Sequence, residues 1–308
     1  MANRPISTQR SISASAWAMM ALLGVIWGGS FTANHAALAE VPVLTAVAFR
    51  IGGAAICLWL VIAARRLPVP FTPRSLAIFA TMGVLNNVLP FCLIVWGQSH
   101  IASGLAAILN ATTAIVTVAL ATMFFPDERL TPQKAVGVAL GLFGVIVIIG
   151  PSALGGFSLG SLGQIAVLGA TVCYAASGVF ARRHLTGLRP EVSAAGMLTA
   201  ASIIMIPLAL WHDGAPTWHY RPETWVALAY LAVISTAVAY MLYYTVLRMA
   251  GAGNVSLVTL MVPPVSVVLG ALLFDEALKP SAYVGFILLA CGLMIIDGRL
   301  RHLRRARA

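Results

Sequence analysis

The chain has 308 residues, of which 60% are hydrophobic and 9% are charged, and its mean hydropathy is +0.94. A soluble domain carries about 25% charged residues because its surface faces water. The composition therefore excludes a soluble globular protein and predicts an all-α integral membrane protein. The net charge of +10 lies in short basic clusters between apolar runs, which indicates cytoplasmic anchors and no nucleic-acid partner.

Ten apolar stretches are long enough to cross a bilayer as helices, each of which needs roughly 20 residues. They lie at about 17–36, 43–64, 75–97, 101–125, 133–150, 161–181, 192–211, 223–248, 252–274 and 281–297. The first stretch, with Arg4 and Arg10 before it and small residues ahead of Glu40, also fits a cleaved secretory signal. It is longer than a usual signal core, so we favour ten retained transmembrane helices.

The orientation follows from the positions of Lys and Arg. With a cytoplasmic N-terminus, sixteen of the 19 basic residues fall on the cytoplasmic side, and only Arg221 and Lys279 fall outside. The remaining one, Arg50, lies within the second stretch. This bias predicts a multi-pass protein of a bacterial-type inner membrane with both termini in the cytoplasm.

The segment FFPDERLTPQKAVGVALGLFG, 124–144, has a counterpart in LFDEALKPSAYVGFILLACG, 273–292. From Asp127 and Asp275 onward, eight of eighteen aligned positions are identical at an offset of 148 residues. Each copy follows four stretches and contains a fifth, and because five is odd the second copy must be inverted in the membrane. We therefore expect two inverted five-helix repeats, 1–151 and 152–308, in one membrane-embedded domain.

Weaker similarities support the repeat. The segment WGGS at 27–30 matches YAAS at 174–177, and Trp96 matches Tyr244. Inverted repeats recur in secondary transporters, where the two halves expose one central site to either side of the membrane alternately. The duplication thus indicates transport by alternating access.

Two five-span halves, each ending in an acidic turn (DERLTP or DEALKP) and a glycine-spaced last helix, resemble the drug/metabolite transporter superfamily, specifically its ten-helix EamA-type exporters. The resemblance covers nearly the whole chain. It implies export of amino acids and related metabolites from bacteria through a central cavity built by both halves. Span nine carries Pro263-Pro264, where such proteins tend to have proline, whereas span four has Ala114-Ile115. We expect helix kinks at Pro263 and Pro264, and another at Pro90 in span three.

Ionisable side chains are almost absent from the predicted spans. All nine acidic residues and all six histidines lie in loops or at span ends, and no Lys lies within a span. A cation–proton antiporter would need a buried carboxylate, and a phosphate carrier would need buried cations, so we expect a neutral or zwitterionic substrate. Arg50 is the exception. We favour a structural role in which it snorkels or bonds to carbonyl groups; the alternative is a gate or a contact with a substrate carboxylate.

Uncharged polar and aromatic residues at mid-span are candidate walls of the cavity. An amide in hydrocarbon needs partners, so each asparagine either joins helices or faces a ligand. The aromatic residues either pack between helices or line the cavity. The predicted substrate-binding residues are Trp27, Asn86, Asn87, Asn110, Tyr174, Tyr240 and Tyr244.

The acidic turns, Asp127-Glu128 and Asp275-Glu276, precede the last helix of each half. Carboxylates stabilise helix N-termini, so we favour stabilisation of that last helix over a role in gating or proton relay. The glycine-rich segment GAGNVS, 251–256, follows no strand and is assigned no nucleotide site.

The predicted function is that of a secondary transporter that exports amino acids or similar small neutral or zwitterionic metabolites across the inner membrane. The alternative is an exporter of other small solutes or drugs, working as a proton-coupled antiporter. No HExxH motif, GxSxG motif or carboxylate pair lies at membrane depth, which disfavours an enzyme, and the inverted repeat disfavours a scaffold or receptor. We expect a small amino-acid-like molecule and the lipid bilayer as partners, no cofactor and no metal; a monomer is compatible with this reading.

Overall fold

The computed structural model describes residues 12–98, 100–101, 103–158, 161–185, 187–274 and 280–297. Throughout these ranges the chain forms helices joined by turns, and no strand occurs in them. The prediction of an all-α fold is therefore confirmed. Asp275 and Glu276, the acidic turn of the second repeat, lie outside the described residues.

Helices fill both halves of the chain. The first half contains α1 (Ala14–Leu38), α2 (Val43–Ala64), α3 (Pro73–Gly83), the π-helix η1 (Val84–Val88), α4 (Leu89–Gln98), α5 (Ser103–Ala111), α6 (Thr113–Phe124) and α7 (Pro132–Ile149). The 3-10 helix η2 (Pro151–Gly156) follows. The second half contains α8 (Leu162–His184), α9 (Pro190–His212), α10 (Pro222–Ala229), the π-helix η3 (Tyr230–Val238), α11 (Ala239–Ala250), α12 (Ala252–Val255), α13 (Val258–Phe274) and α14 (Pro280–Asp297).

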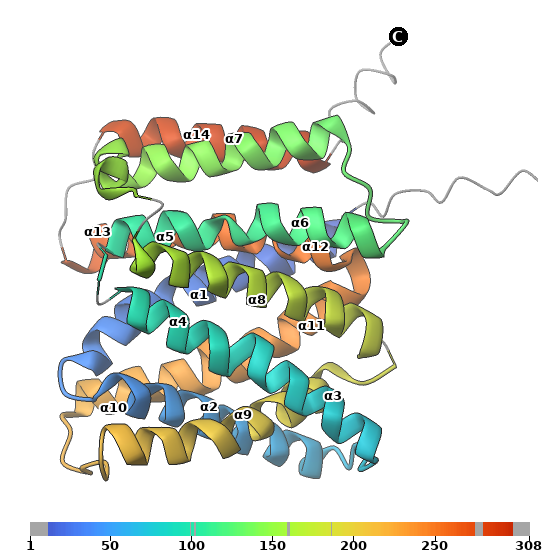
Figure 1. Ribbon diagram of the computed structural model, residues 1–308, viewed down its shortest axis with the longest axis vertical. Helices are drawn as coiled ribbons and strands as arrows, with labels where there is room; N and C mark the ends of the chain where they lie inside the picture. Colours follow the sequence, from blue (N-terminus) through green and yellow to red (C-terminus); the bar gives the residue numbers. More distant parts are fainter. Residues whose placement is uncertain are drawn as a thin grey trace, which may run out of the picture.

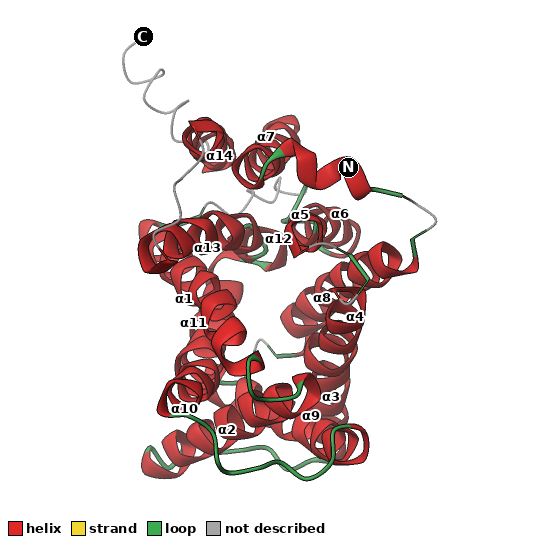
Figure 2. Ribbon diagram, turned by 90° about the vertical axis from the view of Figure 1, so that its left-hand side faces the viewer, coloured by secondary structure: helices red, strands yellow, loops and turns green. Residues whose placement is uncertain are grey.

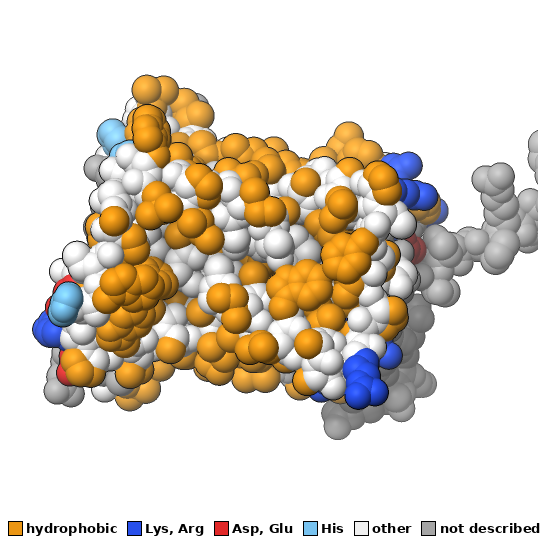
Figure 3. Space-filling view, turned by 90° about the horizontal axis from the view of Figure 1, so that it is seen from below, with side chains coloured by type: hydrophobic (Ala, Val, Ile, Leu, Met, Phe, Trp, Pro, Cys, Tyr) orange, Lys and Arg blue, Asp and Glu red, His pale blue; other side chains and the backbone are white. Residues whose placement is uncertain are grey.

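Eight helical stretches are long and apolar enough to cross a membrane. They are Ala14–Leu38, Val43–Ala64, Pro73–Ile94, Pro132–Ile149, Leu162–His184, Pro190–His212, Pro222–Ala250 and Ala252–Leu269. Two shorter apolar helices, Ile108–Phe124 and Pro280–Ile296, accompany them. These stretches overlap the ten predicted spans, but two are short, so ten membrane crossings remain a prediction. In Figure 3 hydrophobic and uncharged groups cover the face between the charged groups at the two ends.

The two ends differ in charge, and we refer to them by that difference. The loops 65–72, 125–131 and 185–189 lie at one end, which we call the basic end because it carries arginines such as Arg65, Arg129 and Arg189. It is the right-hand end in Figure 1. The other end carries the loops 39–42 and 213–221.

The helices of one half pack against their counterparts in the other. α2 packs along α9, and the two run antiparallel, because the Thr45 backbone N–H donates to Asp213 Oδ2 at 2.7 Å at one end while Arg65 Nη1 lies 3.1 Å from Glu191 Oε1 at the other. α1 packs on α11 and α13, and its counterpart α8 packs on α4 and α6 in the same way. The helices surround a common centre when viewed along their axes (Figure 2). This exchange of equivalent contacts is the packing expected of two inverted repeats.

The last helices of the halves, α7 and α14, lie side by side at one margin of the molecule (Figures 1 and 2). A Cβ at Gly137 would lie 2.6 Å from the Gly292 carbonyl oxygen, and a Cβ at Gly144 would lie 2.8 Å from that of Gly285. Gly137 and Gly144 are the repeat equivalents of Gly285 and Gly292, so the glycines meet in an antiparallel crossing that only glycine permits. The repeated glycines thus bring the two backbones together.

Two π-helices interrupt equivalent spans. η1 lies in span three, and at the repeat offset of 148 residues it coincides with η3 in span eight. The Leu89 N–H bonds to the Val84 carbonyl, five residues back, so the helix is already π-helical before Pro90. α13 includes both Pro263 and Pro264, where a kink stays a prediction, and span nine is also interrupted before α13, between α12 and α13. π-helices are rare and frequent at functional sites, which directs attention to spans three and eight.

Candidate functional site

A network of polar side chains joins the two halves at mid-span. Asn86 Nδ2 donates to the Tyr240 hydroxyl at 3.0 Å, and that hydroxyl donates to Asn87 Oδ1 at 3.0 Å. The Ser177 hydroxyl donates to Asn86 Oδ1 at 2.8 Å. All four side chains are buried. We call these four residues the polar network; two come from the first half and two from the second.

One donor of the polar network is unused. Asn87 is fully buried, and its Nδ2 has no hydrogen-bond partner, whereas Asn86 also reaches Met197 Sδ at 3.5 Å. An unpaired buried amide loses its bonds to water without replacement, and most buried polar groups in proteins do have partners. The π-helix η1 holds both asparagines in the interior, and it leaves this N–H₂ group available.

Arg50 lies close to the polar network and bonds to the second π-helix. Its Nε donates to Thr236 Oγ1 at 2.8 Å, and its Nη2 lies 3.3 Å from Ser235 Oγ. The guanidinium carbon is 5.3 Å from the centre of the Phe91 ring. Arg50 pairs with no carboxylate among the described residues. These two hydroxyl contacts hold the guanidinium in place but do not neutralise its positive charge.

Several predicted site residues lie at a similar distance from the basic end. Arg50 and Asn87 are each fourteen residues from the basic end of their spans, at Ala64 and Pro73, which corresponds to about 21 Å of helix. The Trp27 indole N–H donates to the Ser235 carbonyl at 3.1 Å, next to the Arg50 contact.

Tyr174 lies near this group. Its carbonyl accepts a bond from the Ser177 hydroxyl at 2.8 Å, and its own hydroxyl is within electrostatic reach of Arg50 and Tyr240. The structure thus brings Trp27 and Tyr174 to the neighbourhood of the asparagines.

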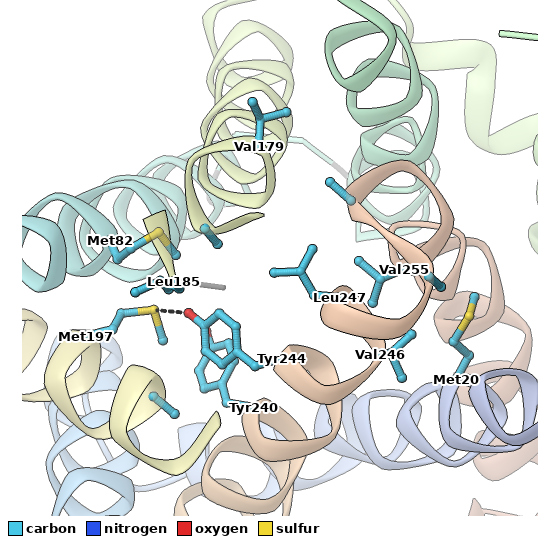
Figure 4. Close-up of a cluster of buried hydrophobic side chains, with 14 of the residues drawn as sticks. Met20, Met82, Val179, Leu185, Met197, Tyr240, Tyr244, Val246, Leu247 and Val255 are labelled. Carbon is cyan, nitrogen blue, oxygen red and sulfur yellow. Dashed lines mark hydrogen bonds between the residues drawn. The ribbon is translucent and has the colours of Figure 1, made fainter. Parts of the chain in front are cut away.

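A cavity of about 390 Å³ lies between the polar network and the basic end. Tyr244 is the one predicted site residue that lines it, and the Tyr244 hydroxyl donates to Met197 Sδ at 3.1 Å (Figure 4). Tyr240 and Tyr244 stack with ring centroids 6.1 Å apart. Tyr244 therefore lies between the cavity and the polar network. The cavity is lined by Phe125, Ala181, Arg182, Leu185, Leu188, Ser193, Tyr244, Leu247 and Arg248.

Asn110 is not joined to the other predicted residues. It lies in α5, and its Oδ1 is buried without a partner. Conversely, sequence reasoning missed Ser177, Met197, Ser235 and Thr236. Serine, threonine and methionine are ordinary inside membrane helices, and only the match of Ser177 to Ser30 in the repeat could have indicated one of them.

The acidic turn of the first repeat makes contacts that were not expected. Glu128 is buried and accepts hydrogen bonds from the guanidinium of Arg182 and from the backbone N–H groups of Ala252 at 2.8 Å and Gly253 at 2.6 Å. Asp127 Oδ2 lies 2.6 Å from Arg182 Nη2. The turn therefore fastens the first half to α8 and α12 of the second half at the basic end.

These contacts correct the expected role of the turn. Glu128 does stabilise a helix start, but the helix is α12 rather than the following helix α7. The start of α7 is capped by Thr131 instead, whose hydroxyl accepts a hydrogen bond from the backbone N–H of Lys134 at 3.2 Å. The N–H groups that bind Glu128 belong to the glycine-rich segment 251–256, which was assigned no nucleotide site. Two of its glycines are needed there: Gly251 has φ of 89°, and a Cβ at Gly253 would lie 2.7 Å from Glu128 Oε2.

Comparisons with known families and proteins agree with one another. The EamA-like transporter family matches residues 15–150 and again residues 161–297. A probable amino-acid metabolite efflux pump of Escherichia coli (strain K12) is 29% identical over 89% of this chain and 92% of its own length. A probable terminal-alkyne amino-acid exporter of Streptantibioticus cattleyicolor is 29% identical over 96% of this chain and 97% of its own. A solved crystal structure superposes with a TM-score of 0.77 at 22% identity, covering 94% of this chain and 99% of that one, which shows a shared fold.

Proposed function

Since the chain belongs to the EamA-like transporter family, we propose that it is a secondary transporter that exports amino acids or similar small, neutral or zwitterionic metabolites across a bacterial inner membrane. The proposal includes ten membrane crossings in two inverted repeats, 1–151 and 152–308, and cytoplasmic termini. The observation that carries it is the polar network, in which buried amides of one half bond to hydroxyls of the other at mid-span.

The arrangement suits alternating access. A site made from both halves changes its exposure when the halves rock against each other. The cavity at the basic end, with Tyr244 at its inner wall, fits a state that accepts substrate from the cytoplasm. Two relatives whose names refer to amino acids support the class of substrate.

The residues available at the site favour this substrate class over the alternatives. Amides, hydroxyls and aromatic rings can bond the amino and carboxyl groups of an amino acid and enclose its side chain. Among the described residues, no carboxylate lies at the depth of the polar network, and such a group would be expected in a proton-coupled exporter of cationic drugs.

The test is uptake by proteoliposomes that contain the purified protein. A panel of labelled L-amino acids and phosphorylated sugars is supplied with and without a pH gradient. We expect flux of uncharged and zwitterionic amino acids, little flux of phosphorylated sugars, and little effect of the gradient. Robust exchange of phosphorylated sugars, or absence of any amino-acid flux, would overturn the proposed function.

A further inference from the structure

Two hydrogen-bond donors at the same depth are unused. The Asn87 Nδ2 group is fully buried and has no partner. Arg50 uses Nε and Nη2 for its contacts with Thr236 and Ser235, and its Nη1 has no hydrogen-bond partner among the described residues. Both residues lie fourteen positions from the basic end of their spans. Unused donors inside a membrane protein indicate a place for an acceptor that is supplied from outside.

The surrounding charge specifies what kind of acceptor fits. Arg50 brings a full positive charge into the membrane-spanning region, and every described carboxylate lies in a loop or at a helix end. The nearest titratable groups from the packed helices are the hydroxyls of Tyr174, Tyr230 and Tyr240, which are neutral in their ordinary form. An anion is therefore needed to neutralise the guanidinium.

The geometry also points to a planar anion with two acceptor atoms. The bonds to Thr236 and Ser235 fix the guanidinium, and Phe91 packs against it. Phe91 lies in span three, as Asn87 does, and Tyr240, whose hydroxyl donates to Asn87 Oδ1, interacts electrostatically with Arg50, so Asn87 and Phe91 both belong to the surroundings of the guanidinium. A guanidinium matches the geometry of a carboxylate, and the Asn87 amide adds a second, neutral donor.

We infer that Arg50 and Asn87 together form the subsite for the substrate carboxylate. This inference rests on the proposed export function and deepens it, because it requires the transported molecule to carry a free carboxylate. Amides and esters of the same molecules are not transported. The amino group and side chain remain for the hydroxyl and aromatic groups around the subsite.

The experiment compares each L-amino acid that has a neutral side chain with its amide, which keeps the side chain and the amino group but lacks the carboxylate. Flux into proteoliposomes and the shift in melting temperature of the purified, detergent-solubilised full-length protein are both measured. The variants are Arg50→Met, Arg50→Lys and Asn87→Leu. Arg74→Met, which removes an exposed arginine near the basic end, is the matched control.

In the wild type we expect transported amino acids to raise the melting temperature and their amides to leave it unchanged. In Arg50→Met and Asn87→Leu the amino acids no longer raise the melting temperature, and flux falls by about tenfold or more, because each variant loses a hydrogen bond to the substrate carboxylate. Arg50→Lys keeps the positive charge but lacks the forked pair of donors, so we expect it to retain part of the flux at a higher KM. This variant tests the subsite if Arg50→Met does not fold. The control behaves as the wild type.

Two outcomes would overturn the inference: full amino-acid flux in folded Arg50→Met, or amides that stabilise the wild type as well as the acids do. If the wild type transports no amino acid, the proposed function fails. The subsite is then tested alone, by comparing the melting temperature of the protein in sodium propionate with that in sodium chloride. Stabilisation by propionate in the wild type but not in the Arg50 and Asn87 variants would support the subsite. Equal response of all variants would refute it.

Discussion

At the scale of single residues, Glu128 shows how a buried charge is accommodated. Its two oxygens receive the Arg182 guanidinium and two backbone N–H groups at the start of α12. Burying a carboxylate is costly unless it is paired and hydrogen-bonded, and here the guanidinium and the two backbone N–H groups fulfil both conditions. Glu128 is therefore a link between the halves that depends on all of its partners.

Glu128→Gln tests this link. The glutamine removes the charge opposite Arg182 and replaces one acceptor by an N–H₂ group, which faces the Gly253 N–H in one amide orientation and the Arg182 and Ala252 donors in the other. We expect a loss of stability of about 3–5 kcal/mol, as for other broken buried ion pairs, measured as a lower melting temperature in detergent. Glu223→Gln, at an exposed site, is the control. Equal melting temperatures for both variants would show that the link contributes nothing.

At the scale of helical elements, the two π-helices are the distinctive feature. η1 carries Asn86 and Asn87, and η3 carries Ser235 and Thr236, the partners of Arg50. A π-helical turn accommodates one residue more than the α-helix around it. This extra residue turns polar groups of both halves toward the centre, so the irregular backbone and the polar site belong together.

Deletion of Leu85 would remove the extra residue of η1 and restore a regular α-helix between α3 and α4. We expect the deletion to keep the helical content, measured by circular dichroism, because the register of the flanking helices is retained. We expect flux in proteoliposomes to fall by at least about tenfold, the equivalent of 1.4 kcal/mol. Leu85→Ala keeps the chain length and should transport normally. Normal flux in the deletion variant would mean that the π-helix is dispensable.

The helical elements were largely predictable and their contacts were not. Long apolar stretches predict helices because the backbone must satisfy its own hydrogen bonds in lipid. The segment repeat predicted that each half ends in an equivalent helix, but not that these two helices, α7 and α14, pack against each other. The backbone partners of Glu128 lie in a glycine-rich segment more than 120 residues away, and no local pattern connects them. The π-helices also have no sequence signature. Mid-span polarity identified Asn86 and Asn87 correctly as buried, yet it also selected Asn110, which has no bond to the network.

At the scale of the whole molecule, the inverted repeat determines the topology. Equivalent helices run antiparallel, as α2 with α9 and α7 with α14 show, so the loops of the basic end share one side. The positive-inside bias predicts that this side faces the cytoplasm. The proposed direction of transport, outward from the cavity at the basic end, depends on this orientation.

Cysteine labelling in whole cells tests the orientation, in a background where the four native cysteines are replaced. Gly187→Cys lies at the basic end and Ala215→Cys at the opposite end, and both positions are exposed. We expect an impermeant maleimide to label position 215 in intact cells and position 187 only after permeabilisation. The reverse pattern would place the basic end outside and contradict export from the cavity.

The central claim is that the mid-span network of both halves forms the transport site, and amino-acid flux in proteoliposomes containing site variants tests it most directly. Asn86→Ala removes bonds to Tyr240 and Ser177, and Trp27→Ala removes the indole beside Arg50. Each should lower flux roughly tenfold, about 1.4 kcal/mol, with folded yield retained. Trp211→Ala, at a residue 82% exposed on the helical surface, should leave flux unchanged. Equal losses in all three variants, or unchanged flux in the first two, would contradict the claim.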